Sequence, residues 1–280
     1  MSTLAEGLHD FLRSPWGWVF AALWGALWGS FLNVAIHRIG LYESVVRPRS
    51  RCPRCGTMVR AVDNIPIVSW LVLRGRCRGC GAPISIRYPL VELLGLALGL
   101  ATYWRFVATA PEAAEAPWLL GRFLVYFFFA ATLVALAGID LDHLIIPDSV
   151  TYPAIPLFFV AGILVGDTPP AELAIGPFVG YGIVALFAEL AYLILKREGM
   201  GYGDAKLLAM VGALLGWRAA VVVFFAAPFG GLAVVPPVML ARRKRVIGVE
   251  IPYGPFLVVA ALAYLYLGQL LPAPLTFNAP

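Results

Sequence analysis

The chain has 280 residues, of which 61% are hydrophobic and only 13% are charged. This composition excludes an ordinary soluble globular protein and indicates a polytopic membrane protein. The formal net charge is +5, but the placement of the charges is more informative than their sum. The first apolar run is too long and too rich in tryptophan for a cleavable signal peptide, and it lacks a small-residue cleavage site.

Long apolar runs predict about eight membrane-spanning helices, because most are close to the ~20 residues that cross a bilayer. In chain order the runs are 16–38, 88–108, 118–139, 149–166, 174–195, 205–217, 219–240 and 252–271. The sixth run is short and glycine-rich, and its boundary with the seventh is the least defined. The predicted fold class is therefore an all-α polytopic integral membrane protein with a small polar loop domain.

Basic residues gather on one side of this predicted topology. Seventeen of the 21 lysines and arginines follow the first, fifth and seventh spans, in the stretches 38–87, 196–206 and 242–245. The stretch after the third span lies on the same side of this topology. The opposite loops are acidic or neutral. Because positively charged loops stay in the cytoplasm, the sequence predicts a cytoplasmic 38–87 loop and both termini on the outer, periplasmic side.

The four cysteines form two close pairs in that loop, Cys52 with Cys55 and Cys77 with Cys80, separated by 21 residues. Two CxxC pairs at this distance are typical of a tetrahedral Zn²⁺ site with four thiolate ligands. Two disulfides, or free or redox-active cysteines, are less favoured alternatives in the reducing cytoplasm. Four protein ligands leave no position for a catalytic water, so the metal is expected to fold the loop. Tight turns around it would suit the nearby Gly56, Gly79 and Gly81.

Two acidic motifs lie where predicted helices meet the cytoplasmic face. Asp140 ends the third span, and Asp204 of the GxGD motif at 201–204 begins the sixth. Ionisable groups at that depth are costly and are therefore a functional-site hypothesis. Two carboxylates held together share one proton, so the pair can act as base and acid on a water, as in aspartic proteases. We expect Gly201 and Gly203 to support the site by letting the backbone adopt positive φ and approach a substrate strand closely.

Asp142 and Asp148 are alternatives to Asp140 within the first motif. Asp142 with His143 fits a solvated loop pair, and Asp148 fits a helix N-cap. Asp140 is the most embedded in apolar sequence, which favours it as the partner of Asp204. The whole set also fits loop acids at helix ends, or the carboxylate relay of a transporter.

Several short motifs follow one another through nearly the whole chain. They are Gly29–Val34, the two CxxC pairs, Asn64-Ile65-Pro66 with Ser69-Trp70, Arg87-Tyr88-Pro89 with Glu92, Asp140 seven residues before Pro147, GxGD at 201–204, and Pro252–Phe256. With these motifs the chain resembles the bacterial type IV prepilin peptidases, or leader peptidase/N-methyltransferases. Presenilin-like proteases share GxGD, but the cysteine loop joined to GxGD in this order is highly specific.

The resemblance implies an integral aspartic endopeptidase of the bacterial inner (cytoplasmic) membrane. Members cleave the basic leader of prepilins and pseudopilins after a glycine, on the cytoplasmic side. Their catalytic aspartates lie in the Asp-x6-Pro and GxGD motifs, which correspond here to Asp140 and Asp204. The implied partners are type IV prepilins or type II secretion pseudopilins and the lipid bilayer, with no nucleic acid.

Many members also methylate the new N-terminal residue with S-adenosylmethionine, and this activity is paired with the cysteine-bearing region. All four cysteines are present, so the resemblance implies the same activity and methyl donor here. The loop is too short for a Rossmann-type domain and has no GxGxxG motif, so no donor-binding residues are predicted. Glu92 fits that site or a buried structural acid paired with a loop arginine, and we favour the structural role. The predicted domains are a first membrane helix at 1–40, the zinc loop at 41–87 and a peptidase core at 88–280.

Three other functions fit parts of the sequence. A presenilin-like intramembrane protease would share the aspartate pair, but the chain has no Pro-Ala-Leu tripeptide, and the zinc loop would be unexplained. A carboxylate-gated transporter would show flux in liposomes without hydrolysis. A non-enzymatic zinc-loop scaffold would tolerate replacement of both aspartates.

Overall fold

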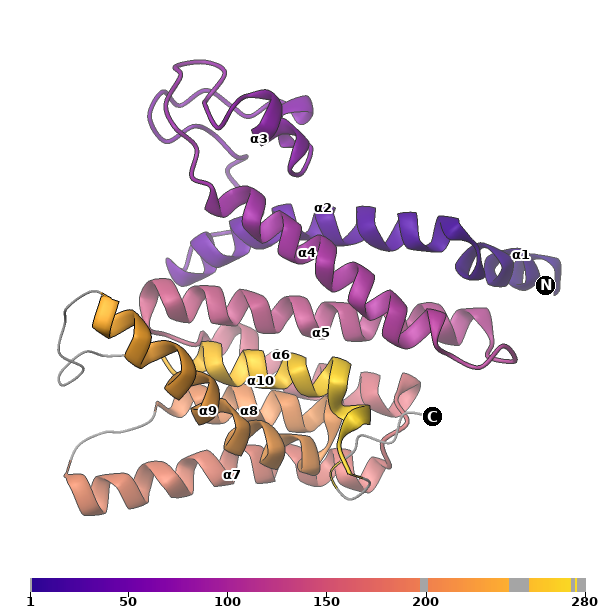
Figure 1. The fold of residues 1–280 in the computed structure, drawn as a ribbon, viewed down its shortest axis with the longest axis vertical. Coiled ribbons are helices and arrows are strands. Elements are labelled where there is room, and N and C mark those ends of the chain that lie inside the picture. The colour runs from indigo at the N-terminus through magenta and orange to yellow at the C-terminus, as the bar shows by residue number, and fades with distance from the viewer. Residues whose placement is uncertain (1, 197–200, 242–251, 273–274, 276–280) are drawn as a thin grey trace. The chain divides into compact units, whose positions relative to one another are not determined.

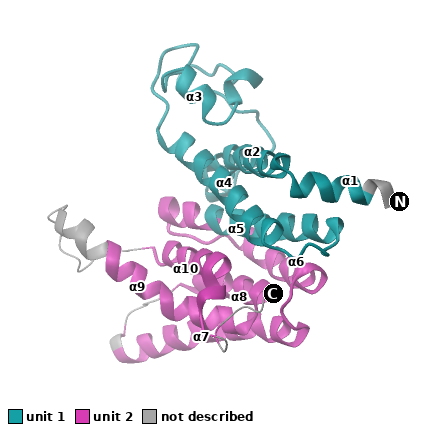
Figure 2. Ribbon diagram, turned by 45° about the vertical axis from the view of Figure 1, so that its right-hand side comes forward, with its two compact units in different colours: residues 1–135 teal, residues 136–280 magenta. Residues whose placement is uncertain are grey.

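The computed structural model describes residues 2–196, 201–241, 252–272 and 275, and in these ranges every long element is a helix (Figure 1). β structure in the described part of the chain is limited to two isolated bridges in the cysteine loop. The chain divides into two compact units, residues 1–135 and 136–280 (Figure 2). Arg197 and the basic run at 242–245, which support part of the predicted topology, lie outside the described residues.

The first unit contains two long helices joined by the cysteine loop. Its elements are α1 (Ser2–Arg13), α2 (Pro15–Gly40), the 3₁₀ helix η1 (Ala61–Asn64), α3 (Val68–Val72), α4 (Arg87–Tyr103), the π-helical turn η2 (Trp104–Ala108) and the start of α5 (Ala116–His143). Helix α2 begins at Pro15 because proline suits the first helical position and the preceding Ser14 hydroxyl caps the Trp16 N–H.

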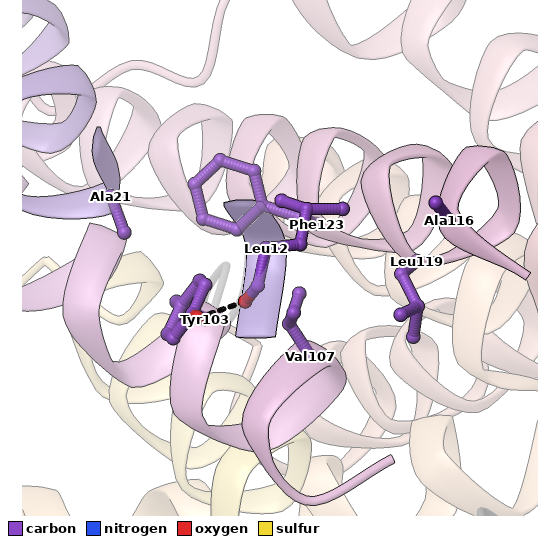
Figure 3. Packing of buried hydrophobic residues seen from close by; sticks show 7 residues of the cluster. All are labelled: Leu12, Ala21, Tyr103, Val107, Ala116, Leu119 and Phe123. Atoms are coloured by element: carbon purple, nitrogen blue, oxygen red, sulfur yellow. Dashed lines mark hydrogen bonds between the residues drawn. The ribbon is translucent and has the colours of Figure 1, made fainter. Parts of the chain in front are cut away.

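A cluster of buried residues anchors α1, which was not among the predicted elements, to the rest of the first unit (Figure 3). Its members are Leu12, Ala21, Tyr103, Val107, Ala116, Leu119 and Phe123. The Tyr103 hydroxyl donates a hydrogen bond to the Leu12 carbonyl, so the polar group in this apolar cluster is satisfied.

Helices α2 and α4 pack closely because small residues line their contact. On α2 they recur every four positions, at Gly17, Ala21, Gly25 and Gly29. A Cβ on Gly25 would collide with the Gly95 carbonyl oxygen and lie 3.0 Å from the Leu96 Cα. Such a pattern lets two membrane helices approach and gain van der Waals contact where lipid supplies no hydrophobic drive.

In the second unit, several helices pack around one buried helix, α8 (Tyr202–Leu215). The elements of this unit are the end of α5, α6 (Asp148–Val165), α7 (Pro170–Leu195), α8, α9 (Trp217–Ala241), α10 (Gly254–Leu267) and the 3₁₀ helix η3 (Gly268–Leu270). Helices α6, α7, α9 and α10 all contact α8. From Asp204 onward, every residue of α8 except Lys206 is buried. Gly216, with φ of 85°, makes the turn that ends α8 and starts α9.

All eight predicted helices form, but the predicted number of about eight membrane spans is wrong. In the described ranges, six helices are long and apolar enough to cross a bilayer, namely α2, α4 with η2, α5, α6, α7 and α9. Helix α8 has 14 residues, and α10 with η3 is also shorter than a span. An apolar run of this length equally suits a helix buried inside protein, and α8 is buried in this way. The fold is that of an all-α, multi-pass membrane protein with about six spans.

We expect Gly25→Ala to lower the melting temperature of the detergent-solubilised protein, because the added methyl group has no room against α4. Overpacking of this kind costs about 1–3 kcal/mol. Gly182→Ala on α7 is the matched control, since nothing lies within 4 Å of a Cβ there. Equal melting temperatures for the two variants would show that the α2–α4 contact is not close.

Candidate active site and cysteine centre

Asp140 lies in the last turn of α5 and is only 6% exposed. Its Oδ2 accepts a hydrogen bond of 3.1 Å from the N–H of Gly254, the first residue of α10. The helix stops just after the acid because Leu144, with φ of 57°, closes the last turn and its N–H bonds the Asp140 carbonyl oxygen at 2.9 Å. The predicted acid is therefore buried and held by a segment more than 100 residues away in sequence.

Asp204 is the third residue of α8 and is 7% exposed. The helix starts here because Gly201 takes an extended N-cap conformation, and the Asp204 N–H bonds the Gly201 carbonyl at 3.1 Å. The Gly201 N–H in turn bonds the Asp204 carboxylate. A carboxylate in the first turn of a helix is favoured by the unpaired N–H groups and the helix dipole.

The ends of three helices converge at these acids. The charge of Asp140 acts on Asp204, and the charge of Asp204 acts on the Tyr253 phenol that precedes α10. A Cβ on Gly254 would lie 2.6 Å from Asp140 Oδ2 and 3.2 Å from Ile146 Cδ1. The structure thus brings together the two aspartates predicted from separate motifs. It adds Tyr253 and Gly254, which belong to the Pro252–Phe256 motif and for which the sequence predicts no role.

The positive φ predicted for Gly201 and Gly203 is wrong, because neither residue adopts it. Gly201 has φ of −80° and ψ of 143°, values open to any residue. Gly203 lies inside α8, where a Cβ would approach the Ile146 Cβ to 2.9 Å. Glycine at 203 therefore makes room for Ile146.

The two alternative acids take other positions. Asp142 is exposed. Asp148 is the first residue of α6 and not its cap, because the N-cap position falls on Pro147. The Asp148 carboxylate pairs with Lys206, whose ammonium also lies 5.3 Å from the Tyr152 ring centre. The sequence analysis predicted no structural role for Lys206. A cation two residues after Asp204 in an otherwise apolar helix could have indicated an ion pair with a nearby acid.

The cysteine centre brings all four predicted thiols together, with every pair of sulfur atoms within 4.8 Å. The Cys52 and Cys80 sulfurs are 3.8 Å apart, and those of Cys55 and Cys77 are 4.0 Å apart. Tetrahedral Zn–S bonds of ~2.3 Å require sulfur atoms separated by ~3.8 Å, whereas a disulfide requires ~2.05 Å. The four free thiols therefore fit a tetrahedral metal site.

The two CxxC pairs are held by the same backbone turn. The Gly56 N–H bonds the Cys52 carbonyl and the Gly81 N–H bonds the Cys77 carbonyl, each at 2.9 Å. Both glycines have φ near 70°, as predicted for tight turns around a metal. Gly79 does not share this conformation. A Cβ there would instead lie 3.1 Å from the Thr57 hydroxyl.

Two further contacts stabilise the cysteine loop. Arg78 forms a forked ion pair with Asp63, with its shortest contact at 2.6 Å. Its hydrogen bonds hold the pKa of the Asp63 carboxyl below its usual range. Glu92 on α4 is 9% exposed, and its Oε2 accepts a 2.6 Å hydrogen bond from the Ile67 N–H. This contact supports the structural role favoured for Glu92, with a loop amide as its partner.

Comparisons with known proteins find similar sequences over most of the chain. Residues 23–106 match the bacterial peptidase A24 N-terminal domain, and residues 127–235 match the type IV leader peptidase family. A prepilin leader peptidase/N-methyltransferase of Myxococcus xanthus is 42% identical over 85% of this chain and 68% of its own length. Proteins with the same name from Dichelobacter nodosus and Aeromonas hydrophila are both 36% identical, over 94% and 96% of this chain and 96% of their own lengths. No solved structure matches the chain significantly.

The helical fold and these matches define a membrane-embedded peptidase. The chain belongs to the type IV leader peptidase family. This membership confirms the resemblance inferred from the motifs.

Proposed function

We propose that this chain cleaves the leader peptide from type IV prepilins and methylates the N-terminal residue that cleavage exposes. The observation that supports the peptidase half is the pair of buried carboxylates, Asp140 and Asp204, within electrostatic range of each other. Both activities are in the names of relatives that align with nearly the full chain.

The proposed chemistry is hydrolysis by general acid–base catalysis, with no covalent intermediate. One carboxylate is ionised and takes a proton from water as its oxygen attacks the scissile carbonyl carbon. The other is protonated and donates its proton to the carbonyl oxygen. When the tetrahedral intermediate collapses, the C–N bond breaks and the proton taken from water passes to the leaving amine. A hydroxyl of the intermediate returns a proton to the other carboxylate, which restores the acid. Burial of both acids strengthens these interactions by excluding water.

We further propose that Cys52, Cys55, Cys77 and Cys80 hold a structural Zn²⁺. The sulfur separations and the repeated backbone turns support this assignment. A bound Zn²⁺ would supply the cross-link that a loop with so small a core needs.

S-adenosylmethionine is the proposed methyl donor, on the strength of the relatives' names. The described residues contain no β-sheet of the kind that binds dinucleotides, only two isolated bridges. We also propose that the chain divides into a first membrane helix at 1–40, a cysteine loop at 41–87 and a peptidase core at 88–280. Methylation is assigned to the cysteine-bearing part.

The proposed orientation places the active site at the cytoplasmic face of the inner membrane and both termini on the periplasmic side. The ten arginines of 38–87 and the basic residues at 196–206 support it, because they still share one side when only the six candidate spans are counted. Prepilins, and pseudopilins of type II secretion, would then present their basic leaders to the side on which cleavage occurs.

Purified protein in detergent, supplied with S-adenosylmethionine and a prepilin whose basic leader ends in Gly-Phe, provides the test. Mass spectrometry should show loss of the leader and addition of one methyl group to the new terminus. Cleavage without methylation would support the peptidase activity and contradict the methyltransferase activity. An intact substrate would remove the peptidase proposal.

We expect Gly254→Ala to lower kcat for leader cleavage by roughly 100-fold, because the added methyl group displaces Asp140. KM should change little if the substrate is held elsewhere. Gly268→Ala is the control on the same segment, since the nearest atoms to a Cβ there are 3.7 Å away. Normal kcat in Gly254→Ala would mean that the Gly254 contact does not position Asp140.

A further inference from the structure

Helix α3 of the cysteine loop turns its apolar side chains outward. Val68, Leu71 and Val72 are 52%, 61% and 70% exposed. Their spacing of three and four residues places them on one side of the helix. A helix packed on a water-soluble domain normally shows the reverse pattern.

The inward side of α3 carries the polar contacts. Ser69 is 8% exposed, and its hydroxyl donates to the Val62 carbonyl at 2.9 Å. The Trp70 indole N–H donates to the Ile84 carbonyl at 3.1 Å, and its ring packs against Gly75. The outward orientation of the apolar residues is therefore built into the fold of the loop.

Two more apolar residues beside α3 are exposed, Val62 at 64% and Ile65 at 49%. We name the whole set the α3 face: Val62, Ile65, Val68, Leu71 and Val72. A group of large apolar side chains left exposed by the fold marks a contact surface, whether with protein or with a membrane.

The charge of the surrounding loop favours a membrane as the partner. Residues 41–87 contain nine arginines but only two acids, Glu43 and Asp63, and Asp63 is paired with Arg78. Arg74 and Arg76, which directly follow α3, are exposed. Near an anionic leaflet each arginine strengthens binding by about fivefold.

The loop is also tied to the bilayer at both ends. It runs from the end of α2 at Gly40 to the start of α4 at Arg87, and both helices are candidate spans. Tyr42 and Tyr88, next to these ends, are exposed, as aromatic residues at a membrane interface are. In both ribbon views the lobe that carries α3 lies to one side of α2 and α4 (Figure 1, Figure 2).

We propose that the α3 face, with Arg74 and Arg76, docks onto the surface of a bilayer that contains anionic phospholipids. The apolar side chains enter the headgroup region while the arginines contact lipid phosphates. This docking holds the cysteine loop against the membrane and does not depend on the peptidase activity.

The test places a benzophenone amino acid at position 71 of the full-length protein in nanodiscs. Leu71 is exposed, so the probe leaves the core of the loop intact. Nanodiscs of phosphatidylcholine alone are compared with nanodiscs that also contain phosphatidylglycerol. We expect photocrosslinks to phospholipid, with a several-fold higher yield in the anionic discs that falls at 1 M salt, where the Debye length is only ~3 Å.

Matched arginine variants locate the contact. Arg74→Gln with Arg76→Gln should lower the lipid crosslink by fivefold or more, at about fivefold for each lost charge. Arg49→Gln with Arg51→Gln removes the same charge from exposed positions farther from α3 in sequence and should have less effect. An equal loss in both double variants would overturn docking through α3.

Other crosslinking partners would also overturn the proposal. Adducts with this protein chain alone would make the α3 face a protein contact. Adducts with added prepilin in place of lipid would make it a substrate contact. A lipid yield independent of phosphatidylglycerol would rule out recognition of anionic headgroups.

Discussion

Asparagine in place of Asp204 or Asp140 is expected to abolish leader cleavage, with kcat falling by roughly 1,000-fold or more. Asparagine has nearly the same shape as aspartate but can neither take a proton from water nor deliver one to the leaving group. Either change leaves the proposed pair with a single carboxylate. Cleavage of a prepilin by the purified variants, followed by mass spectrometry, measures the loss.

Matched changes at the neighbouring acids test whether the loss is specific. Asp142→Asn and Asp148→Asn remove acids that are exposed, so cleavage should fall by a few-fold at most. Methylation of a peptide supplied already cleaved would show that the two inactive variants are folded. If Asp204→Asn cleaved at the wild-type rate, the carboxylate mechanism would be wrong.

Cys77→Ser is expected to empty the cysteine centre of metal and to open the loop between α2 and α4. The wild type should contain about one zinc per chain, and the variant almost none, because three thiolates hold the ion far less tightly. Without that cross-link the loop has little to hold it, since its short elements bury few side chains. Metal analysis gives the zinc content, and limited proteolysis within residues 41–87 reports the opening.

Arg54→Ser is the control, because it lies between two of the cysteines and leaves all four ligands in place. Chelation of the wild type should reproduce the effect of Cys77→Ser. A loop that resists protease after chelation and has no titratable thiols would point to two disulfides instead.

Local sequence features were sufficient to predict most of the helices, the cysteine cluster and the protein family. Apolar runs mark helices, because a backbone in lipid must satisfy its own hydrogen bonds, and the run predicted at 16–38 became α2 at Pro15–Gly40. The spacing of the two CxxC pairs is itself typical of a metal site, so the cysteine cluster could be predicted without knowledge of the fold. The motifs were also specific enough to indicate the family that the comparisons confirm.

Other features depend on what packs against a segment, and only the tertiary structure decided them. The apolar run of α8 has the composition of a span, but neighbouring helices bury 11 of its 14 residues. Glycine is needed at 203 and 254 because Ile146 and Asp140 occupy the space a Cβ would take. The outward apolar side of α3 likewise follows from Ser69 and Trp70 finding partners inside the loop. Such contacts join residues distant in the chain, and local sequence patterns do not encode them.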